Sequence, residues 1–405
     1  MTLTETEGAA GPSASTPTRS ARWSFLTRMD LWVLAVFGIW LVLVLVGLFV
    51  ALHVLEPRLS LHDGFRTVVV NSDAGWLREI NVLGYQWNGN ANVASDIAFL
   101  PVYPLVVAAV HALGLGWNGA CFLVSVVCQG VTLLLLGRLL TTTGATARQI
   151  RWAIGFALVY PAALFAVTGF GTTMLNLCVV GALLLHRRGH RTGAFVVAGL
   201  ATGLYYTGLA VPVALVVAEL RARGTRSVVS LPGVGRVLLG FSGVIGYMAY
   251  LWARFDNPFA SLAVQKAWTG TASFGTVLTH AVTLSPVAQG FLGYISQRQE
   301  ADLSHLFDAP FLLLLVIAAV WLLLGRHGIE TWLLAAGGLL VLYNSAKAGY
   351  PFSVIRLAYP LFIVLPMNPR VRGLMDRVTW TVPSLGCLAI SCYWITILAR
   401  RLFTD

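Results

Sequence analysis

The chain has 405 residues, of which 57% are hydrophobic and only 11% are charged. Soluble domains carry about 25% charged residues, so this composition excludes a water-soluble globular protein. The net charge of +11 does not indicate nucleic-acid binding, because the basic residues cluster in short loops between apolar runs. Such loops orient membrane helices with their positive ends in the cytoplasm. We therefore predict an all-α, polytopic integral membrane protein.

The N-terminal part combines a polar tail with a first membrane span. Residues 1–20 are rich in Ser, Thr, Gly, Pro and Ala, and we predict a disordered cytoplasmic tail over residues 1–30 before a single transmembrane domain, residues 31–400. Leu31–Val54 is too long for a signal-peptide core and lacks a small-residue cleavage site, so we interpret it as a retained span. The bias for Arg over Lys is typical of a GC-rich bacterial genome. We expect a multi-pass protein of the bacterial cell (plasma) membrane with a cytoplasmic N-terminus.

Roughly 10–12 hydrophobic segments are expected in total. Those after the first lie at about 97–114, 118–140, 152–168, 172–186, 193–205, 207–220, 236–254, 308–325, 329–346, 352–368 and 379–398.

Two of these regions constrain the topology. If Asp96 is outside and the basic stretch 138–151 inside, segments 97–114 and 118–140 cannot both cross, so one is re-entrant or interfacial. Thr192–Glu219 lies between two basic loops and is too short for two full crossings at 1.5 Å per residue. It predicts two short helices that meet at Tyr205–Gly208.

Three polar segments are predicted on the outer side, at about 55–96, 255–308 and 344–356. The first is large and holds five of the 16 carboxylates of the chain, among them Asp63, Asp73, Glu79 and Asp96. Because the candidate polar chemistry all faces one side, the sequence favours an outward-facing active site.

Asp73 is the candidate catalytic residue. Transfer of a group to a hydroxyl needs a base that takes the proton as the new bond forms, and a carboxylate can serve. Gly75 and Trp76 follow it, which suits a tight turn beside a ring that can stack on a sugar. The alternative is a solvated loop residue that caps a helix starting at Ala74.

Arg356 is the candidate anion-binding residue. It lies in the apolar segment 352–360, where an arginine is costly and usually paired. A guanidinium binds two phosphate oxygens at once, so a lipid phosphate fits. The alternative is snorkelling to the headgroup layer. The two lysines of the chain, Lys266 and Lys347, are weaker candidates of the same kind.

Other residue types give weaker signals. Tyr103, Tyr205 and Tyr206 are typical interface aromatics, unless they line a cavity wall and stack on a sugar. The eight histidines and five cysteines show no metal-ligand spacing, so no metal ligand is predicted. A divalent cation on the carboxylates Asp73 and Glu79 or Asp96 is the cofactor alternative left open.

Motifs in the outer segments resemble those of one enzyme family. They read Asp73-Ala74-Gly75-Trp76 with Gly84-Tyr85, Phe99-Leu100-Pro101-Val102-Tyr103-Pro104, Asp256-Asn257-Pro258-Phe259, Gln265-Lys266-Ala267-Trp268 and Arg356-Leu357-Ala358-Tyr359-Pro360-Leu361. Together they resemble the bacterial relatives of GPI mannosyltransferase 2 (the phosphatidylinositol-glycan class V type), in the C-type glycosyltransferase superfamily. Two departures stand out: the stretch 168–173 lacks the acid of the family, and Tyr205-Tyr206-Thr207-Gly208 lacks its arginine.

The resemblance implies an inverting glycosyltransferase of the C-type fold, with a large first extracytoplasmic loop. The donor would be a polyprenyl-phosphate-linked sugar, mannose by resemblance, and the acceptor a lipid-linked or envelope glycan, a glycolipid or a protein at the outer face. Asp73 would deprotonate the acceptor hydroxyl. Arg356, with Lys347 or Lys266, would hold the donor phosphate, and the sugar site would be shaped by Trp76, Tyr85 and Tyr103.

Two other function classes stay open. The missing acid and arginine favour a non-catalytic polyprenyl-lipid-binding protein of envelope assembly on the same scaffold. A transporter would place ionisable groups at mid-membrane on broken helices, whereas the acids here lie in loops and no inverted repeat is visible.

Overall fold

The computed structural model describes residues 27–55, 57–58, 60–69, 73–296, 304–325, 328–351, 353–377, 384–392 and 395. Within these ranges the chain is helical and has no strand, which confirms the all-α prediction. The predicted tail up to residue 26, residues 297–303 of the second outer segment and most of the flanks of the last hydrophobic segment lie outside the described residues.

Four of the described helices are long and apolar enough to cross a membrane: α1 (Arg28–Leu55), α5 (Trp117–Thr142), α11 (Leu231–Phe255) and α17 (Ile329–Ala348). Shorter apolar helices are α4 (Val102–His111), α7 (Thr172–Arg187), α16 (Ser304–Leu323) and α18 (Val354–Phe362). These elements support the predicted membrane protein. The larger number of hydrophobic segments, the membrane side of the N-terminus and the C-type fold stay predictions.

The remaining elements are shorter or more polar. The α-helices are α2 (Leu61–Val69), α3 (Asp73–Leu83), α6 (Ala147–Val159), α8 (Arg191–Thr202), α9 (Ala210–Arg223), α10 (Arg226–Val229), α12 (Ala260–Val264), α13 (Lys266–Thr269), α14 (Phe274–Thr283), α15 (Ser285–Ser296) and α19 (Pro369–Arg377). The 3-10 helices are η1 (Asp96–Ala98), η2 (Pro161–Ala166), η3 (Tyr206–Leu209) and η4 (Leu365–Met367).

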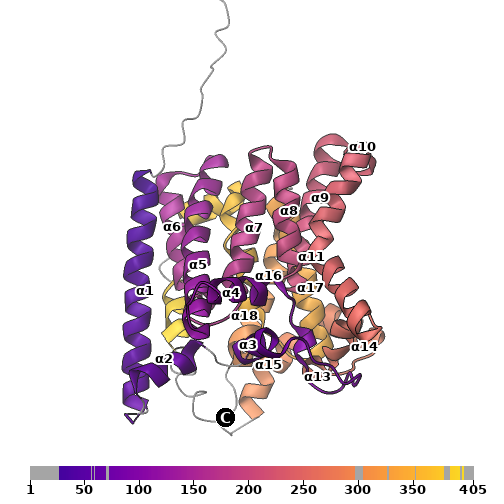
Figure 1. Ribbon diagram of the computed structural model, residues 1–405. Coiled ribbons are helices and arrows are strands. Elements are labelled where there is room, and N and C mark those ends of the chain that lie inside the picture. The colour runs from indigo at the N-terminus through magenta and orange to yellow at the C-terminus, as the bar shows by residue number, and fades with distance from the viewer. Residues whose placement is uncertain are drawn as a thin grey trace, which may run out of the picture.

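The long helices run side by side, and the short helices of the outer segments gather at one end of the bundle (Figure 1). Helix α7 packs between α5 and α8, and the core includes the fully buried Leu133 and Leu136 of α5 and Leu183 of α7. Helix α1 lies at the edge with many exposed apolar side chains, among them Leu43 and Val54, as expected for a surface that meets lipid.

At the opposite end of the bundle, arginines pair with buried carboxylates. Glu219 is buried and lies within salt-bridge distance of Arg191, at 3.4 Å, and Arg138 pairs with the buried Asp30 at 3.2 Å. Charge is therefore concentrated at the helix ends away from the short outer helices, which fits the positive loops seen in the sequence.

Two topological expectations can be compared with these helices. Helix α4 has 10 residues and covers about 15 Å, too little to cross a bilayer, whereas α5 has 26 residues and is long enough; by length, α4 fits the predicted non-crossing member of the pair 97–114 and 118–140. Helices α8 and α9 have 12 and 14 residues and are joined by irregular backbone around η3. This confirms the two short helices predicted to meet at Tyr205–Gly208.

Glycines allow helices α8 and α11 to pack closely. A Cβ on Gly199 would lie 2.3 Å from the carbonyl oxygen of Leu239, and one on Gly243 would lie 2.3 Å from that of Gly199. Gly203 continues the seam one turn later, in the small-xxx-small spacing that brings membrane helices together. The carbonyl oxygen of Gly203 also accepts a hydrogen bond from the Val102 amide at 3.0 Å, which attaches α4 to α8.

Candidate active site

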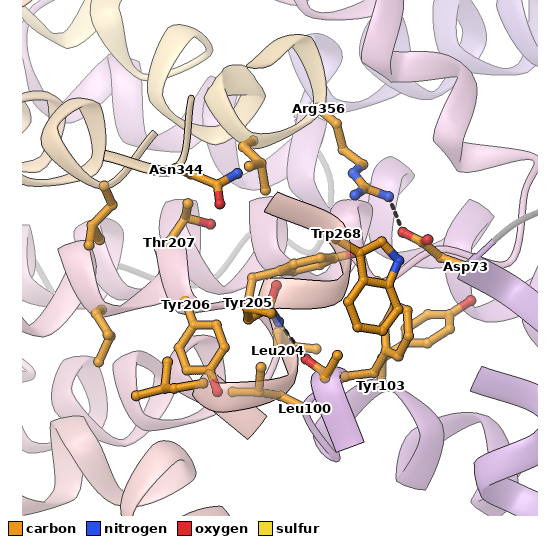
Figure 2. Close-up of a pocket in the computed structure, with 18 of the residues that line it drawn as sticks. Asp73, Leu100, Tyr103, Leu204, Tyr205, Tyr206, Thr207, Trp268, Asn344 and Arg356 are labelled. Carbon is orange, nitrogen blue, oxygen red and sulfur yellow. Dashed lines mark hydrogen bonds and ion pairs between the residues drawn. The ribbon is translucent and has the colours of Figure 1, made fainter. Parts of the chain in front are cut away.

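A cavity of about 380 Å³ lies where α3, the η1–α4 connection, the α8–α9 break, α13, α17 and α18 converge. Its walls are mainly apolar, with polar groups from Asp73, Arg356, Lys347, Asn344 and Thr207. Figure 2 shows Asp73 and Arg356 together at one side, and Asn344 and Thr207 at the other. The outer segments therefore contribute to one site.

Asp73 and Arg356 meet in this cavity although they lie 283 positions apart. Arg356 Nη1 donates a hydrogen bond to Asp73 Oδ2, and the side chains are only 16% and 23% exposed, respectively. The guanidinium lies 5.3 Å from the Phe170 ring and 6.0 Å from the Phe165 ring. The two leading candidates of the sequence are thus an ion pair in an aromatic setting.

The first turn of α18 fixes where Arg356 points. The Ile355 amide donates a hydrogen bond of 2.7 Å to Asp308 Oδ1, and Asp308 is buried in α16. This carboxylate satisfies one of the N–H groups that every helix start leaves open. Ser353, just before the helix, has a φ of 51°, so the chain enters α18 through a left-handed turn.

Asp73 is the first described residue of α3, as expected of a residue near a helix start. A carboxylate there is stabilised by the positive end of the helix dipole. No hydrogen bond or ion pair among the described residues involves Asp73 Oδ1. One oxygen is therefore held by Arg356, and the other is available to a ligand.

The stretch 168–173 forms part of the wall through Gly171. The Gly169 amide donates to the carbonyl oxygen of Val69 at 2.8 Å, and Gly171 lines the cavity. A Cβ on Gly171 would lie 3.2 Å from Tyr103 and 3.3 Å from Tyr205, so a larger side chain has little room. The backbone here is tightly enclosed by the aromatics around the cavity.

Three aromatic residues were predicted to shape a sugar site, and one of them lines the cavity. Tyr103 does so, with its hydroxyl 3.1 Å from Ser125 Oγ. Tyr85 lies behind the wall: its hydroxyl donates to the Phe99 carbonyl at 2.9 Å, and burial raises its pKa. Trp76 also lies behind the wall, stacked on Phe99 with ring centroids 6.3 Å apart. Both support the wall residue Phe99.

The two lysines lie on neighbouring helices. Lys347, in the last turn of α17, lines the cavity and is half-buried. Lys266 begins α13, which packs against α17, and is exposed. The two ammonium groups are close enough to interact electrostatically. None of the salt bridges formed within the described ranges involves either lysine.

The other carboxylates of the first outer segment are placed differently. Asp96 Oδ1 and Oδ2 accept hydrogen bonds from the Gln86 amide at 2.9 and 3.0 Å, and burial raises the pKa of this carboxyl group. Glu79 is exposed, and neither residue lines the cavity. No group of three or more His, Cys, Asp and Glu side chains in the described part of the chain could hold a metal ion.

Three cavity residues had no assigned role in the sequence. Trp268 lines the cavity beside Phe99, with ring centroids 6.1 Å apart. The Gln265–Trp268 motif is the sequence feature that could have identified it. Asn344 lies three positions before Lys347 on α17, so helical spacing places both on one face. Thr207, in the α8–α9 break, has a buried hydroxyl without a hydrogen-bond partner among the described residues. No sequence pattern singled out Asn344.

No protein-family model and no curated protein matches the chain.

Proposed function

We propose that the protein is a membrane glycosyltransferase that uses a polyprenyl-phosphate-linked sugar donor, with mannose the sugar favoured by the sequence motifs. The observation that carries the proposal is Asp73, which faces a cavity with one free carboxylate oxygen while cationic side chains line the same cavity. A general base and an anion-binding group are the two components that such a transfer requires.

In the proposed reaction the acceptor hydroxyl attacks the anomeric carbon of the donor sugar. A bond forms between the acceptor oxygen and this carbon, and the bond from the carbon to the phosphate oxygen breaks. The hydroxyl proton passes to Asp73 Oδ1, and the phosphate leaves with the electron pair. The new bond forms opposite the leaving group, so the configuration inverts. Arg356 holds the other oxygen of Asp73 and orients the carboxylate.

The walls suit such substrates. Trp268 and Tyr205 supply aromatic faces on which a sugar ring can pack, and Asn344 and Thr207 supply uncharged partners for its hydroxyls. The leucines of the cavity offer an apolar surface to a lipid-linked substrate: Leu77, Leu100, Leu204, Leu209, Leu262, Leu340 and Leu357. A bacterial plasma membrane with the site at its outer face is the proposed location, and an envelope glycan, glycolipid or protein the proposed acceptor.

The test is transfer of radiolabelled mannose from polyprenyl phosphate to a lipid extract by the purified protein. Asp73→Asn is expected to lower the rate by a factor of about 10² to 10⁴, the usual contribution of a general base. Asp63→Asn is the matched control. Asp63 lies in the same outer segment, but it is exposed in the first turn of α2, where it accepts a hydrogen bond of 2.6 Å from the Ser60 hydroxyl. Full activity of Asp73→Asn would refute the assignment.

A panel of other polyprenyl-phosphate sugars separates the enzyme from its alternatives. Transfer of a different sugar would retain the reaction and change the specificity. Binding of the donors without transfer of any sugar would favour the non-catalytic lipid-binding protein, for which the absent acid in residues 168–173 is the supporting observation.

A further inference from the structure

The cavity contains two cationic positions, and they differ in how their charge is compensated. Arg356 lies deep in the site, and Lys347 lies in the last turn of α17 with Lys266 nearby. From the sequence all three are candidates for a phosphate ligand, and the two lysines are weaker candidates than Arg356. The contacts in the structure separate them.

The positive charge of Arg356 is already neutralised by a partner within the protein. Its guanidinium hydrogen-bonds Asp73, and the buried Asp308, which holds the neighbouring Ile355 amide, also interacts with it electrostatically. The Asp73 carboxylate therefore already neutralises the guanidinium. An anion that approached this end would meet no surplus positive charge, and it would have to compete with Asp73 for Arg356.

The positive charges of the two lysines are not neutralised by a salt bridge with a described acidic side chain. Lys347 lines the cavity, Lys266 lies on the neighbouring helix α13, and none of the described acidic side chains forms a salt bridge with either. Two like charges that are close together without a counter-ion are unfavourable, and an anion between or beside them relieves the repulsion. The positive end of the cavity is therefore the lysine end.

We propose that Lys347, supported by Lys266, binds the phosphate of the substrate, and that Arg356 is a positioning residue that holds the Asp73 carboxylate. The inference rests on the proposed function for the identity of the phosphate-bearing substrate. It places the phosphate at the α13–α17 end and directs the attached sugar along Trp268 and Tyr205 toward Asp73. One observation favours the opposite assignment, since Arg356 Nε is buried without a hydrogen-bond acceptor among the described residues.

Binding of dodecyl phosphate to the purified protein, measured by calorimetry, distinguishes the two assignments. Lys347→Gln is expected to weaken binding about tenfold or more, the effect of losing one charge-assisted hydrogen bond. Lys266→Gln should weaken it less, because Lys266 does not line the cavity. Arg254→Gln is the matched control for the loss of one positive charge, since Arg254 lies near the end of α11 and outside the cavity.

The decisive variant is the double substitution Asp73→Asn with Arg356→Gln. It removes the guanidinium but leaves the charge of that end unchanged, because one positive and one negative charge disappear together. We expect its affinity for dodecyl phosphate to stay within about twofold of the unmodified protein, below the tenfold that one charged hydrogen bond represents. A tenfold loss in the double variant with no loss in Lys347→Gln would overturn the inference, and so would the absence of any binding.

Inorganic phosphate is the second probe. Weaker binding than dodecyl phosphate, with the same dependence on Lys347, supports a lipid-linked phosphate; equal binding supports a free phosphate at the same lysines. The result is separable from the proposed function: lysine-dependent binding without sugar transfer retains the inference and removes the enzyme. Transfer that requires Asp73, together with phosphate binding that requires Arg356, would retain the proposed function and overturn the inference.

Discussion

The ion pair between Asp73 and Arg356 can be tested by a double-mutant cycle on stability. Exposed pairs contribute about 0–1 kcal/mol, whereas loss of one partner from a fully buried pair costs about 3–5 kcal/mol. With exposed fractions of 23% for Asp73 and 16% for Arg356, this pair lies between the two limits. We expect Asp73→Asn and Arg356→Gln each to lower the free energy of unfolding by about 2 kcal/mol. Asp73→Asn leaves the Arg356 guanidinium, beside Phe165 and Phe170, without its partner, and Arg356→Gln leaves the Asp73 carboxylate without its partner.

The double variant is the informative one. Two neutral amides leave no uncompensated charge, so its loss should be no larger than that of either single variant, which gives a coupling of about 2 kcal/mol. The assay is unfolding of the purified protein in mixed micelles by sodium dodecyl sulfate, followed by circular dichroism. Additive losses, with a coupling below about 0.5 kcal/mol, would show that the two side chains do not pair. Arg254→Gln should change the stability by less than about 0.5 kcal/mol.

Three further predictions concern the scaffold. Gly199→Leu would place a side chain against the Leu239 carbonyl and separate α8 from α11, so we expect a loss of about 3 kcal/mol in the same unfolding assay; unchanged stability would contradict the close packing. Asp308→Ala removes the acceptor of the Ile355 amide and should cost about 1–3 kcal/mol, whereas Asp308→Asn, which keeps an acceptor oxygen, should cost less; equal losses would argue against this bond. Burial raises the pKa of Asp96 above its ordinary value of 3.8, so its ionisation favours the unfolded chain. Stability should therefore fall as pH rises from 3.8 through the folded pKa of Asp96. Asp96→Asn should flatten this part of the plot of melting temperature against pH. An unchanged plot in Asp96→Asn would contradict the assignment of this pH dependence to Asp96.

Several features of the fold follow from local properties of the sequence. Apolar length predicts membrane helices, because a helix must cover the hydrocarbon with residues that need no water. Leu31–Val54 becomes α1, and the stretch 172–186 becomes α7. The short helices α8 and α9 could be predicted because the rise per residue sets how far 28 residues reach. The same arithmetic could not choose which of 97–114 and 118–140 fails to cross, because that depends on where α4 ends and what it packs against.

The candidate site divides in the same way. Asp73 could be selected from sequence because Gly75 and Trp76 follow it in a polar outer segment, and Arg356 because a charge in an apolar segment is costly. Their pairing could not be predicted, since it joins α3 to α18 across most of the chain. Trp76 and Trp268 look alike in sequence, yet Trp268 lines the cavity and Trp76 lies behind Phe99. Which face of a helix meets the cavity depends on how neighbouring elements rotate against it, and no local pattern contains that information. Composition and spacing were enough for the membrane class, the helices and the residues worth testing; the partners, the cavity and the separation of its two charged ends come from packing between segments that are distant in the chain.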